Sequence, residues 1–500
     1  MPVPGIDDVA GIDGAAGIDG AAGIDSAAVD ALRDERVDWR FKGMPASAFG
    51  GTVGEFLARL PRLFDAGFVG PLLTLDRRAM RHNLRTMADW CARHGLELAP
   101  HGKTTMAPQL FRWQLQNGSW GITAANISQL RVYRAFGVER VLLANQLVDA
   151  DGLGWLGAEL DAHPEFRCAC FVDSVPGAQI MTDALNRRGT TRQLEVIVEL
   201  GSDGARTGAR NSAQAQEIAD AVADSPVLRL AGVGGYEGAL AGDVSTPSLA
   251  AIDDYLARLR ELVADFAASG RFAGCDEVIV TCGGSAYFDQ VAEALTGPWP
   301  TDLPVVPVLR SGGYLLHDDG FYRVRSPFGR DHRLAGEEPP FRPAMRMWAQ
   351  VTSRPEPGMA LLTMGRRDVS YDQELPEPQA LRDADGVFHT LPAGSCEVTS
   401  LADQHAFLTI HRADPDDPDS PDDEVDPQVG DWICFGLSHP CTVLDKWTLV
   451  PVVAGDPTAG RDRAAVGETA GDEPTAGEEP AADNDSAPDD TVVDLVRTFF

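Results

Sequence analysis

A lysine follows a short apolar run within residues 96–108, whose sequence is LELAPHGKTTMAP. Lys103 comes directly after His101 and Gly102, at the point where a strand would run out into a loop. A lysine held there in a dry pocket loses hydration, and its lowered pKa lets it form a Schiff base with an aldehyde. Taken alone, this stretch is explained more simply as a surface lysine beside a turn. Motifs elsewhere in the chain favour the catalytic interpretation.

Two glycine-containing segments are candidates for binding anionic groups. In TCGGS, Gly283 and Gly284 let backbone N–H groups approach a phosphate, and Ser285 adds a hydroxyl donor. In residues 199–208, ELGSDGARTG, three glycines form a tight loop that can direct Arg206 inward. A guanidinium there stays charged at any working pH and can hold a phenolate oxygen. The plainer alternatives are a turn for the first segment and a surface salt bridge for the arginine.

Two tyrosines lie in similar glycine-rich surroundings. Tyr236 ends a predicted strand in VGGYEG, and Tyr314 follows Gly312 and Gly313 in RSGGYLLHD. Either ring can pack beside a planar cofactor, and the phenol of Tyr236 can also hydrogen-bond to it. For Tyr236 on its own, a core position is the simpler interpretation.

A histidine and a cysteine lie two residues apart in SHPC, residues 438–441. If this segment is extended, His439 and Cys441 point to the same side. A neutral imidazole and a thiolate suit zinc, with the remaining positions left to water or substrate. A buried cysteine near an unrelated histidine explains the pair about equally well. His405, in DQH, is a third polar group that could complete a site or cap a turn.

These residues need a scaffold, and the hydrophobic pattern predicts one. From about residue 70 to 325, short apolar runs alternate with longer amphipathic ones. This alternation predicts an α/β fold, a (β/α)8 TIM-type barrel. The candidate residues of this region come just after predicted strands, which places them at the carboxyl-terminal mouth of such a barrel. A doubly wound sheet is the structural alternative. The predicted strands are residues 71–75, 96–99, 120–123, 141–143, 169–173, 194–200, 228–236, 277–281 and 305–310.

After about residue 341, strand-like runs separated by Gly, Pro and Asp predict a second, mostly β domain. The final TVVDLVRTFF alternates as a strand does, so we expect it to pair within that domain. The other runs are residues 345–353, 359–363, 406–411, 432–436 and 442–453. The predicted boundaries are 1–30 for a disordered low-complexity tail, 31–69 for a segment packing on the β domain, 70–335 for the barrel, 336–453 plus 491–500 for the β domain with its metal site, and 454–490 for an acidic disordered insertion.

Charge and composition narrow the class of protein. The net charge is −33, but residues 413–427 hold eight acids without a base, and residues 454–490 hold eleven acids with two arginines. Because a polyanion would be repelled, we expect no nucleic-acid partner. The sequence has no apolar run long enough for a membrane span, and its N-terminus lacks the basic and apolar regions of a secretory signal. Eight cysteines without small-scaffold spacing indicate reduced thiols in the cytoplasm.

Five motifs, PHGKTTM, ELGSDGARTG, TCGGS, RSGGY and SHPC, occur in an order that resembles the D-serine dehydratase-like and D-threonine aldolase-like family. Members are fold-type III pyridoxal-phosphate enzymes related to alanine racemase, with a (β/α)8 barrel and a β domain, and they work as dimers. The resemblance covers residues 70–453 and the last ten residues. It implies that the Schiff-base lysine is Lys103, that the arginine near the cofactor phenolate is Arg206, and that the metal pair is His439 and Cys441. By the same resemblance, the phosphate loop and cofactor-lining residues are Gly283, Gly284, Ser285, Tyr236 and Tyr314.

The resemblance also implies pyridoxal 5′-phosphate and a divalent metal, zinc or manganese, as cofactors. The expected activity converts a D-3-hydroxy amino acid into a 2-oxo acid and ammonia, with Lys103 as the base for the α-proton. The aldolase branch usually carries Asp at the position of Cys441, which favours the dehydratase. The alternatives are retro-aldol cleavage with His405 as candidate base, racemisation, and a non-catalytic pyridoxal-phosphate-binding protein. D-serine, D-threonine and 3-hydroxyaspartate all stay open as substrates.

Overall fold

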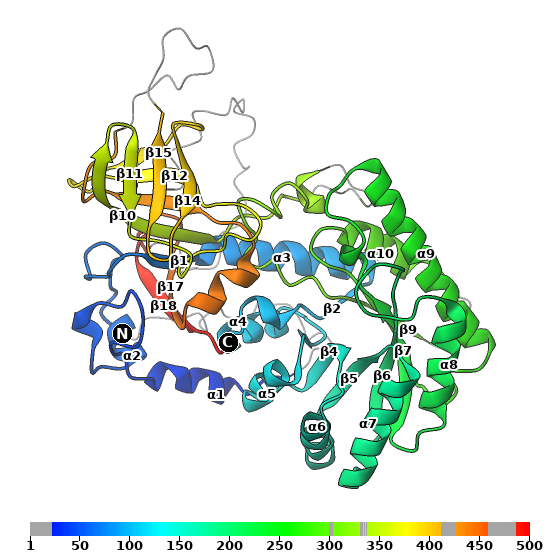
Figure 1. Ribbon diagram of the computed structural model, residues 1–500. Coiled ribbons are helices and arrows are strands. Elements are labelled where there is room, and N and C mark those ends of the chain that lie inside the picture. The colour runs from blue at the N-terminus through cyan, green and yellow to red at the C-terminus, as the bar shows by residue number, and fades with distance from the viewer. Residues whose placement is uncertain are drawn as a thin grey trace, which may run out of the picture.

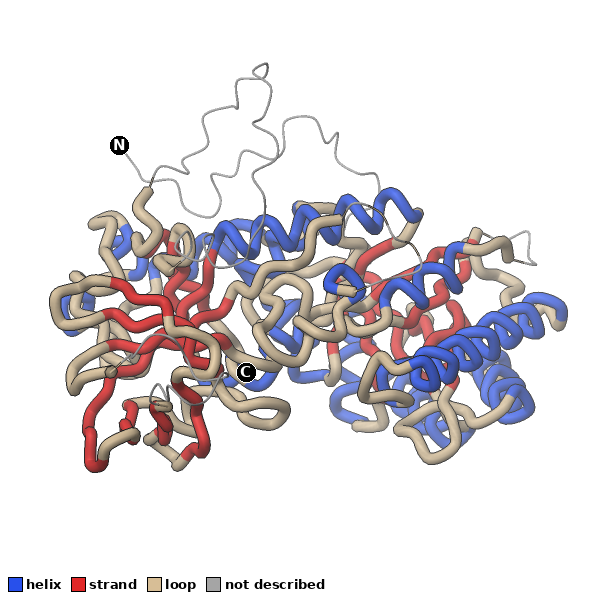
Figure 2. The backbone as a smooth tube through the Cα atoms, turned by 90° about the horizontal axis from the view of Figure 1, so that it is seen from above, coloured by secondary structure: helices blue, strands red, loops and turns tan. Residues whose placement is uncertain are grey.

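The computed structural model describes residues 23–299, 304–330, 334, 336, 338–411, 426–458 and 487–500. An α/β unit that carries most of the helices lies beside a smaller β unit (Figure 1). Seen from above, the strands form two separate groups, and the longer helices surround one of them (Figure 2). The predicted fold class, an α/β barrel with a second, mostly β domain, is confirmed. Most of the predicted tail and of both acidic insertions lies outside the described residues.

Eight parallel strands form the barrel, in the order β2-β9-β8-β7-β6-β5-β4-β3. The two ends of this sheet meet where β2 (Glu97–Leu98) approaches β3 (Ile122–Ala124), because Thr123 N donates to Pro100 O over 2.9 Å. A closed parallel sheet brings all the carboxyl ends of its strands to one mouth. The other strands are β4 (Arg140–Gln146), β5 (Arg167–Val172), β6 (Leu194–Leu200), β7 (Leu228–Gly235), β8 (Val278–Cys282) and β9 (Val305–Leu309).

Alternate strand residues face the barrel interior and the surrounding helices. Ile197 packs in the interior cluster, whereas Val196 and Val198 on either side of it belong to the larger cluster shared with the helices. The helices that the pattern predicted are α3 (Arg77–His94), α4 (Pro108–Gln116), α5 (Ile127–Ala135), α7 (Val175–Arg188), α8 (Ser212–Ala223) and α9 (Thr246–Ala268). The pattern missed α6 (Ala150–Ala162) and α10 (Phe288–Thr296). Three glycines inside α6 lower its intrinsic helix propensity, which weakens the signal.

The first predicted barrel strand belongs to the other domain. β1 (Leu72–Asp76) pairs antiparallel with β10 (Met345–Glu356) and parallel with β17 (Leu449–Val453). All five residues of β1 are buried, and a fully buried strand has the same sequence pattern in either sheet. Asp76 then caps α3 by accepting a 3.0 Å hydrogen bond from Ala79 N, so the chain passes into the barrel unit at this point.

The β domain is built on a sheet with the order β13-β12-β16-β10-β1-β17-β18, and β11, β14 and β15 branch from β10. The prediction that the C-terminal residues pair within this domain is confirmed, because β18 (Val492–Arg497) runs antiparallel to β17. The predicted strand at residues 442–453 is wrong in its first half, since β17 starts only at Leu449. The remaining strands are β11 (Met359–Leu362), β12 (Glu377–Arg382), β13 (Phe388–Thr390), β14 (Cys396–Leu401), β15 (Ala406–Ile410) and β16 (Trp432–Gly436).

The N-terminal segment packs on the β domain through a separate apolar cluster. Phe41, Phe56 and Leu63 of this segment share the cluster with Trp348 of β10 and Leu495 of β18. The ordered chain begins earlier than residue 31, because α1 (Ser26–Asp30) is helical and its Asp30 pairs with Arg112 over 2.6 Å. In the described part of the chain, no helix is both long and apolar enough to cross a membrane.

Candidate active site

A cavity of about 140 Å³ lies between the barrel mouth and the β domain, and we call it the mouth cavity. Its lining comes from the ends of barrel strands and from the turn that precedes β17. The mouth cavity brings together eight of the predicted residues, Lys103, Arg206, Tyr236, Gly283, Gly284, Ser285, His439 and Cys441. Two of the predicted residues, Tyr314 and His405, do not line it.

Lys103 lies in the short helix η4 (Gly102–Thr104), just beyond the end of β2. The residue is exposed, so the single chain does not hold it in the dry pocket that its sequence surroundings suggest. Next to it, His101 has a buried Nδ1 atom with no hydrogen-bond partner among the described residues. Burial, together with the charges of Lys103 and Arg310, lowers the pKa of His101 well below its usual value. His101 is therefore a neutral imidazole at the cavity wall.

The glycine pair after β8 is held by a carboxylate. Gly283 and Gly284 donate their backbone N–H groups to Glu237 over 2.9 and 2.7 Å, and Glu237 is fully buried. These two N–H groups therefore have an anionic partner in this structure, and their binding of a phosphate stays a prediction. A glycine is needed at position 283, because its φ of +105° and the nearby Leu309 side chain both disfavour a Cβ atom.

Ser285 offers a hydroxyl to the mouth cavity. Its Oγ accepts a 3.1 Å hydrogen bond from Gly313 N and also contacts Tyr322. A Cβ atom on Gly313 would meet the Tyr322 ring at 2.8 Å, so the glycine lets this ring approach the strand end. Ser285 and Tyr322 therefore both offer hydroxyl groups to an anionic ligand.

Two arginines reach the cavity in different ways. The Arg206 guanidinium lies over the Tyr236 ring, 4.9 Å from its centre, and the residue is exposed. Burial raises the pKa of Tyr236 to about 12, so its phenol stays protonated. Arg310 is buried and donates to Thr281 Oγ1 over 2.8 Å and to Gly235 O over 2.6 Å. Arg206 is therefore the more adaptable cation, while Arg310 ties neighbouring strands together.

His439 and Cys441 meet in a turn rather than in an extended strand. Residues Pro440–Thr442 form the short helix η7, and His439 before it has a left-handed φ of 55°. A hydrogen bond with Cys441 raises the pKa of His439 to about 9, with Asp372 adding to the effect. Burial acts to raise the pKa of the Cys441 thiol, but the hydrogen bond from His439 and the charge of Lys103 lower it below its usual value. The pair therefore favours a thiolate.

The structure removes two residues from the predicted site. Tyr314 is 2% exposed, and its hydroxyl accepts a 3.2 Å hydrogen bond from Gln114 Nε2 in the core behind the barrel mouth. Tyr322 lines the cavity instead, and the cofactor contact of Tyr314 stays a prediction. His405 is exposed in the turn between β14 and β15, where its carbonyl oxygen accepts from Ala402 N. It caps a hairpin, which was the other outcome that the sequence allowed.

Sequence reasoning also missed residues that the structure places at or next to the candidate site. Arg310 begins the RSGGY motif, so its position directly after β9 was a usable signal. Glu237 follows Tyr236 at the end of β7 and could have been noticed in the same way. Tyr322 and Asp372 lie in loops without a recognisable pattern, and only the folded chain brings them to the site.

Comparison with known proteins assigns both units. The family described as "Alanine racemase, N-terminal domain" matches residues 75–295, and the family described as "Putative serine dehydratase domain" matches residues 344–453. A 3-hydroxy-D-aspartate aldolase from Paracoccus denitrificans (strain Pd 1222) is 26% identical over 65% of this chain and 80% of its own length. A D-threonine aldolase from an Arthrobacter species is 26% identical over 69% of this chain and 87% of its own.

Solved structures give the same architecture. The crystal structure of D-threonine aldolase from Filomicrobium marinum has a TM-score of 0.61 and 23% identity, covering 77% of this chain and 92% of the other. The D-threo-3-hydroxyaspartate dehydratase from Delftia sp. HT23 has a TM-score of 0.58 and 19% identity, covering 77% and 94%. The fold is that of fold-type III pyridoxal-phosphate enzymes. Within that class, the chain combines an alanine racemase-like N-terminal domain with a serine dehydratase-like domain, and it is similar to D-threonine and 3-hydroxy-D-aspartate aldolases.

The residues around the mouth cavity fit pyridoxal phosphate and a metal. Lys103 can bind the cofactor aldehyde, Arg206 can bind an anionic ring oxygen, and Ser285 can bind the phosphate. The buried Nδ1 atom of His101 has no hydrogen-bond partner among the described residues, so the cavity wall is polar there. Imidazole and thiolate suit zinc. Among the described residues no group of three or more His, Cys, Asp or Glu side chains is arranged to hold a metal, so further ligands beside His439 and Cys441 would be water or substrate.

Proposed function

We propose that the protein is a pyridoxal-phosphate-dependent lyase that converts a D-3-hydroxy amino acid into a 2-oxo acid and ammonia. The observation that carries the proposal is that Lys103 and the pair His439 and Cys441 line one cavity. Elimination needs a base for the α-hydrogen and a Lewis acid for the β-hydroxyl on the same substrate. The shared cavity of Lys103, His439 and Cys441 supports this proposal.

Each residue has a defined task in this proposal. Bound pyridoxal phosphate would supply an electron sink for the charge that develops at the α-carbon. Lys103 would hold the cofactor aldehyde and, once freed by the substrate amine, would take the α-proton at Nζ. Arg206 would hold the anionic ring oxygen, supported from behind by the Tyr236 ring. Ser285 would donate its hydroxyl to the phosphate.

A divalent metal, zinc or manganese, would supply Lewis acidity for the departing hydroxyl. His439 and Cys441 are the residues that would hold it. The lowered thiol pKa supports this assignment, because a thiolate and not a thiol is the metal ligand.

Retro-aldol cleavage is the second candidate, and the two curated relatives named above favour it because both are aldolases. Cleavage needs a base for the hydroxyl proton. The predicted base, His405, is exposed and does not line the cavity, whereas His101 does. The imidazole of His101 is neutral, as a base must be, although its lowered pKa makes it a weak one.

A product assay separates the two reactions. Purified, cofactor-loaded protein is incubated with D-serine, D-threonine or D-threo-3-hydroxyaspartate, with and without a chelator. Chelator-sensitive release of ammonia and 2-oxo acid supports the dehydratase. Glycine with an aldehyde supports the aldolase, and a yellow protein that forms neither product from these substrates contradicts both.

The family resemblance adds a homodimer and a cytoplasmic location to the proposal. Light scattering on the purified full chain tests the dimer, and cell fractionation tests the location. A monomer that is fully active would contradict the dimer.

A further inference from the structure

We propose that Asp372 is a positioning residue that makes Nε2, rather than Nδ1, the metal-binding atom of His439. The inference rests on the proposed function, because it concerns the metal site of that lyase. Asp372 lies in the loop between β11 and β12, and none of the sequence motifs includes it.

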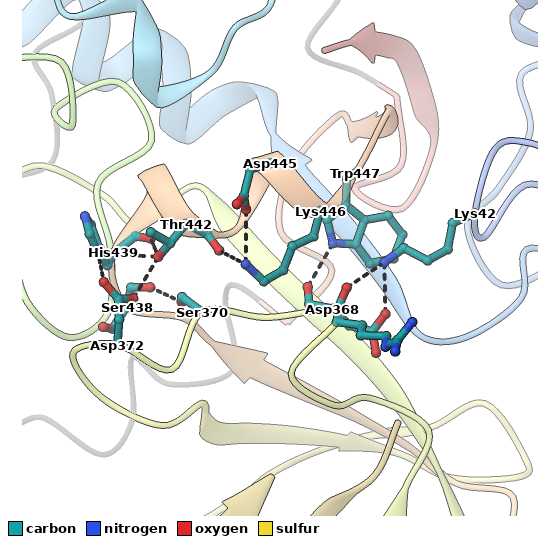
Figure 3. A network of polar contacts seen from close by, with 11 residues as sticks. Lys42, Asp368, Ser370, Asp372, Ser438, His439, Thr442, Asp445, Lys446 and Trp447 are labelled. Atoms are coloured by element: carbon teal, nitrogen blue, oxygen red, sulfur yellow. Dashed lines mark hydrogen bonds and ion pairs between the residues drawn. The ribbon is translucent and has the colours of Figure 1, made fainter. Parts of the chain in front are cut away.

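The two carboxylate oxygens of Asp372 have separate partners. Oδ2 lies 2.5 Å from His439 Nδ1, and Oδ1 accepts a 2.8 Å hydrogen bond from Thr442 Oγ1 (Figure 3). The threonine therefore holds the carboxylate in place while it faces the imidazole. A carboxylate that accepts from Nδ1–H fixes the ring tautomer and leaves the Nε2 lone pair for a metal.

Cys441 interacts with the same imidazole. The side chains of His439 and Cys441 are hydrogen-bonded, and both residues line the mouth cavity. Because Nδ1 is directed at Asp372, Nε2 is the ring nitrogen left to share a metal with the sulfur. The sulfur also lies 3.3 Å from Thr104 Oγ1 of the barrel, which keeps it at the mouth cavity.

The backbone at His439 is held by residues other than Asp372. His439 N donates to Asp318 Oδ2 over 3.1 Å, and the Ser370 hydroxyl donates to Ser438 O. These contacts support a left-handed residue that the chain would otherwise disfavour. They do not touch the imidazole. Thr442 contributes to both the backbone and the ring, because its Oγ1 also donates to His439 O over 3.2 Å. Asp372 is thus the residue assigned to ring orientation, which is a property separate from the fold of the turn.

Metal affinity tests this assignment. The full chain, loaded with pyridoxal phosphate and stripped of metal, is titrated with Zn²⁺ and Co²⁺ in competition with a chromophoric chelator. Asp372→Ala is expected to weaken binding by about 10- to 100-fold, the usual effect of losing such an outer partner. Asp372→Asn is expected to lie between wild type and alanine, because its amide oxygen can still accept from Nδ1–H while the charge is lost. Glu374→Gln is the matched control, since it removes a carboxylate from the same loop and is expected to leave the affinity within about twofold.

Further variants keep the test decisive. Thr442→Val leaves the Asp372 charge but removes its anchor, so it is expected to weaken binding several-fold in the same direction. Thermal unfolding of each metal-free variant shows whether the fold is retained. The Co²⁺–thiolate absorption band is expected to persist in Asp372→Ala at saturating metal, because Cys441 is unchanged.

Failure of the inference and failure of the proposed function look different. If wild type binds and uses the metal but Asp372→Ala and Thr442→Val bind it equally well, the positioning role is overturned and the lyase proposal stands. If wild type and His439→Ala bind the metal alike, the metal site itself is wrong and both proposals fall.

Discussion

Thr104 Oγ1 and Cys441 Sγ lie 3.3 Å apart, although 337 positions separate them in the sequence. The threonine follows Lys103 at the barrel mouth, and the cysteine belongs to the β domain. Their contact joins the two units at the cavity. The candidate base and the candidate metal ligands therefore depend on the docking of one domain against the other.

Reduction with borohydride is expected to attach the cofactor to Lys103. The chain has only three lysines, Lys42, Lys103 and Lys446, so peptide mapping after reduction gives an unambiguous answer. Lys103→Ala is expected to lose the visible absorption and to lower turnover by at least about 10²-fold, because it removes the general base. Label on either of the other two lysines would contradict the assignment.

Gly283→Ala is expected to destabilise the protein more than an ordinary substitution at a left-handed glycine. A Cβ atom at this position would meet a terminal carbon of the Leu309 side chain in addition to the unfavourable φ of +105°. Gly274→Ala is the matched control, because its φ is +87° but nothing lies within 4 Å of the added atom. The control should cost about 1–2 kcal/mol of unfolding free energy. Denaturant unfolding measures both, and equal losses would contradict the close packing.

Tyr322 and Tyr314 are expected to respond differently to loss of their hydroxyls. Tyr322→Phe removes a cavity hydroxyl that contacts Ser285, so cofactor affinity should fall by up to about tenfold. Tyr314→Phe leaves the buried amide of Gln114 without this partner and should cost about 1 kcal/mol of stability, with cofactor affinity unchanged. Cofactor titration and thermal unfolding separate the two effects. A cofactor defect in Tyr314→Phe would restore that residue to the site.

Asp494 in β18 is expected to make stability fall as the pH rises through about 6. Burial raises the pKa of Asp494 from its usual value near 3.8 to about 6, although Arg33 partly opposes the effect. An acid with a raised folded-state pKa stabilises the fold fully below its unfolded-state pKa and loses that stabilisation as the pH rises through its folded-state value. Asp494→Asn should therefore gain up to about 3 kcal/mol relative to wild type between about pH 4 and pH 7.5.

Denaturant unfolding across this pH range measures the effect of Asp494 on the free energy of unfolding. The control is Asp385→Asn, which changes an exposed aspartate in a turn. A difference between Asp494→Asn and wild type that does not change with pH would contradict the prediction.

His405→Ala is expected to leave turnover within about twofold of wild type, because the residue is exposed and does not line the cavity. Steady-state rates with the best substrate test this. A loss of 10²-fold or more, the range of a lost general base, would return His405 to the mechanism.

The sequence by itself determined the barrel, most of the second domain and the identity of the chemistry-bearing motifs. Period-two and helical hydrophobic patterns are local, so β6 could be placed at residues 194–200 without a structure. Motifs such as those of Lys103 and His439 are likewise contiguous in the chain. The C-terminal strand could also be predicted, because its alternation of apolar and polar residues is distinct from the long polar segment before it.

Only the tertiary structure decided what those residues meet. The sheet that β1 joins depends on non-local pairing, and Tyr314 and Tyr322 could be told apart only by which ring faces the cavity. The glycine pair could not reveal its partner, because Glu237 reaches it from another strand end. Asp372 carried no local pattern at all, since its role comes from a contact with a histidine 67 residues away. Contacts of this kind arise from packing between distant segments, and a local pattern holds no information about them.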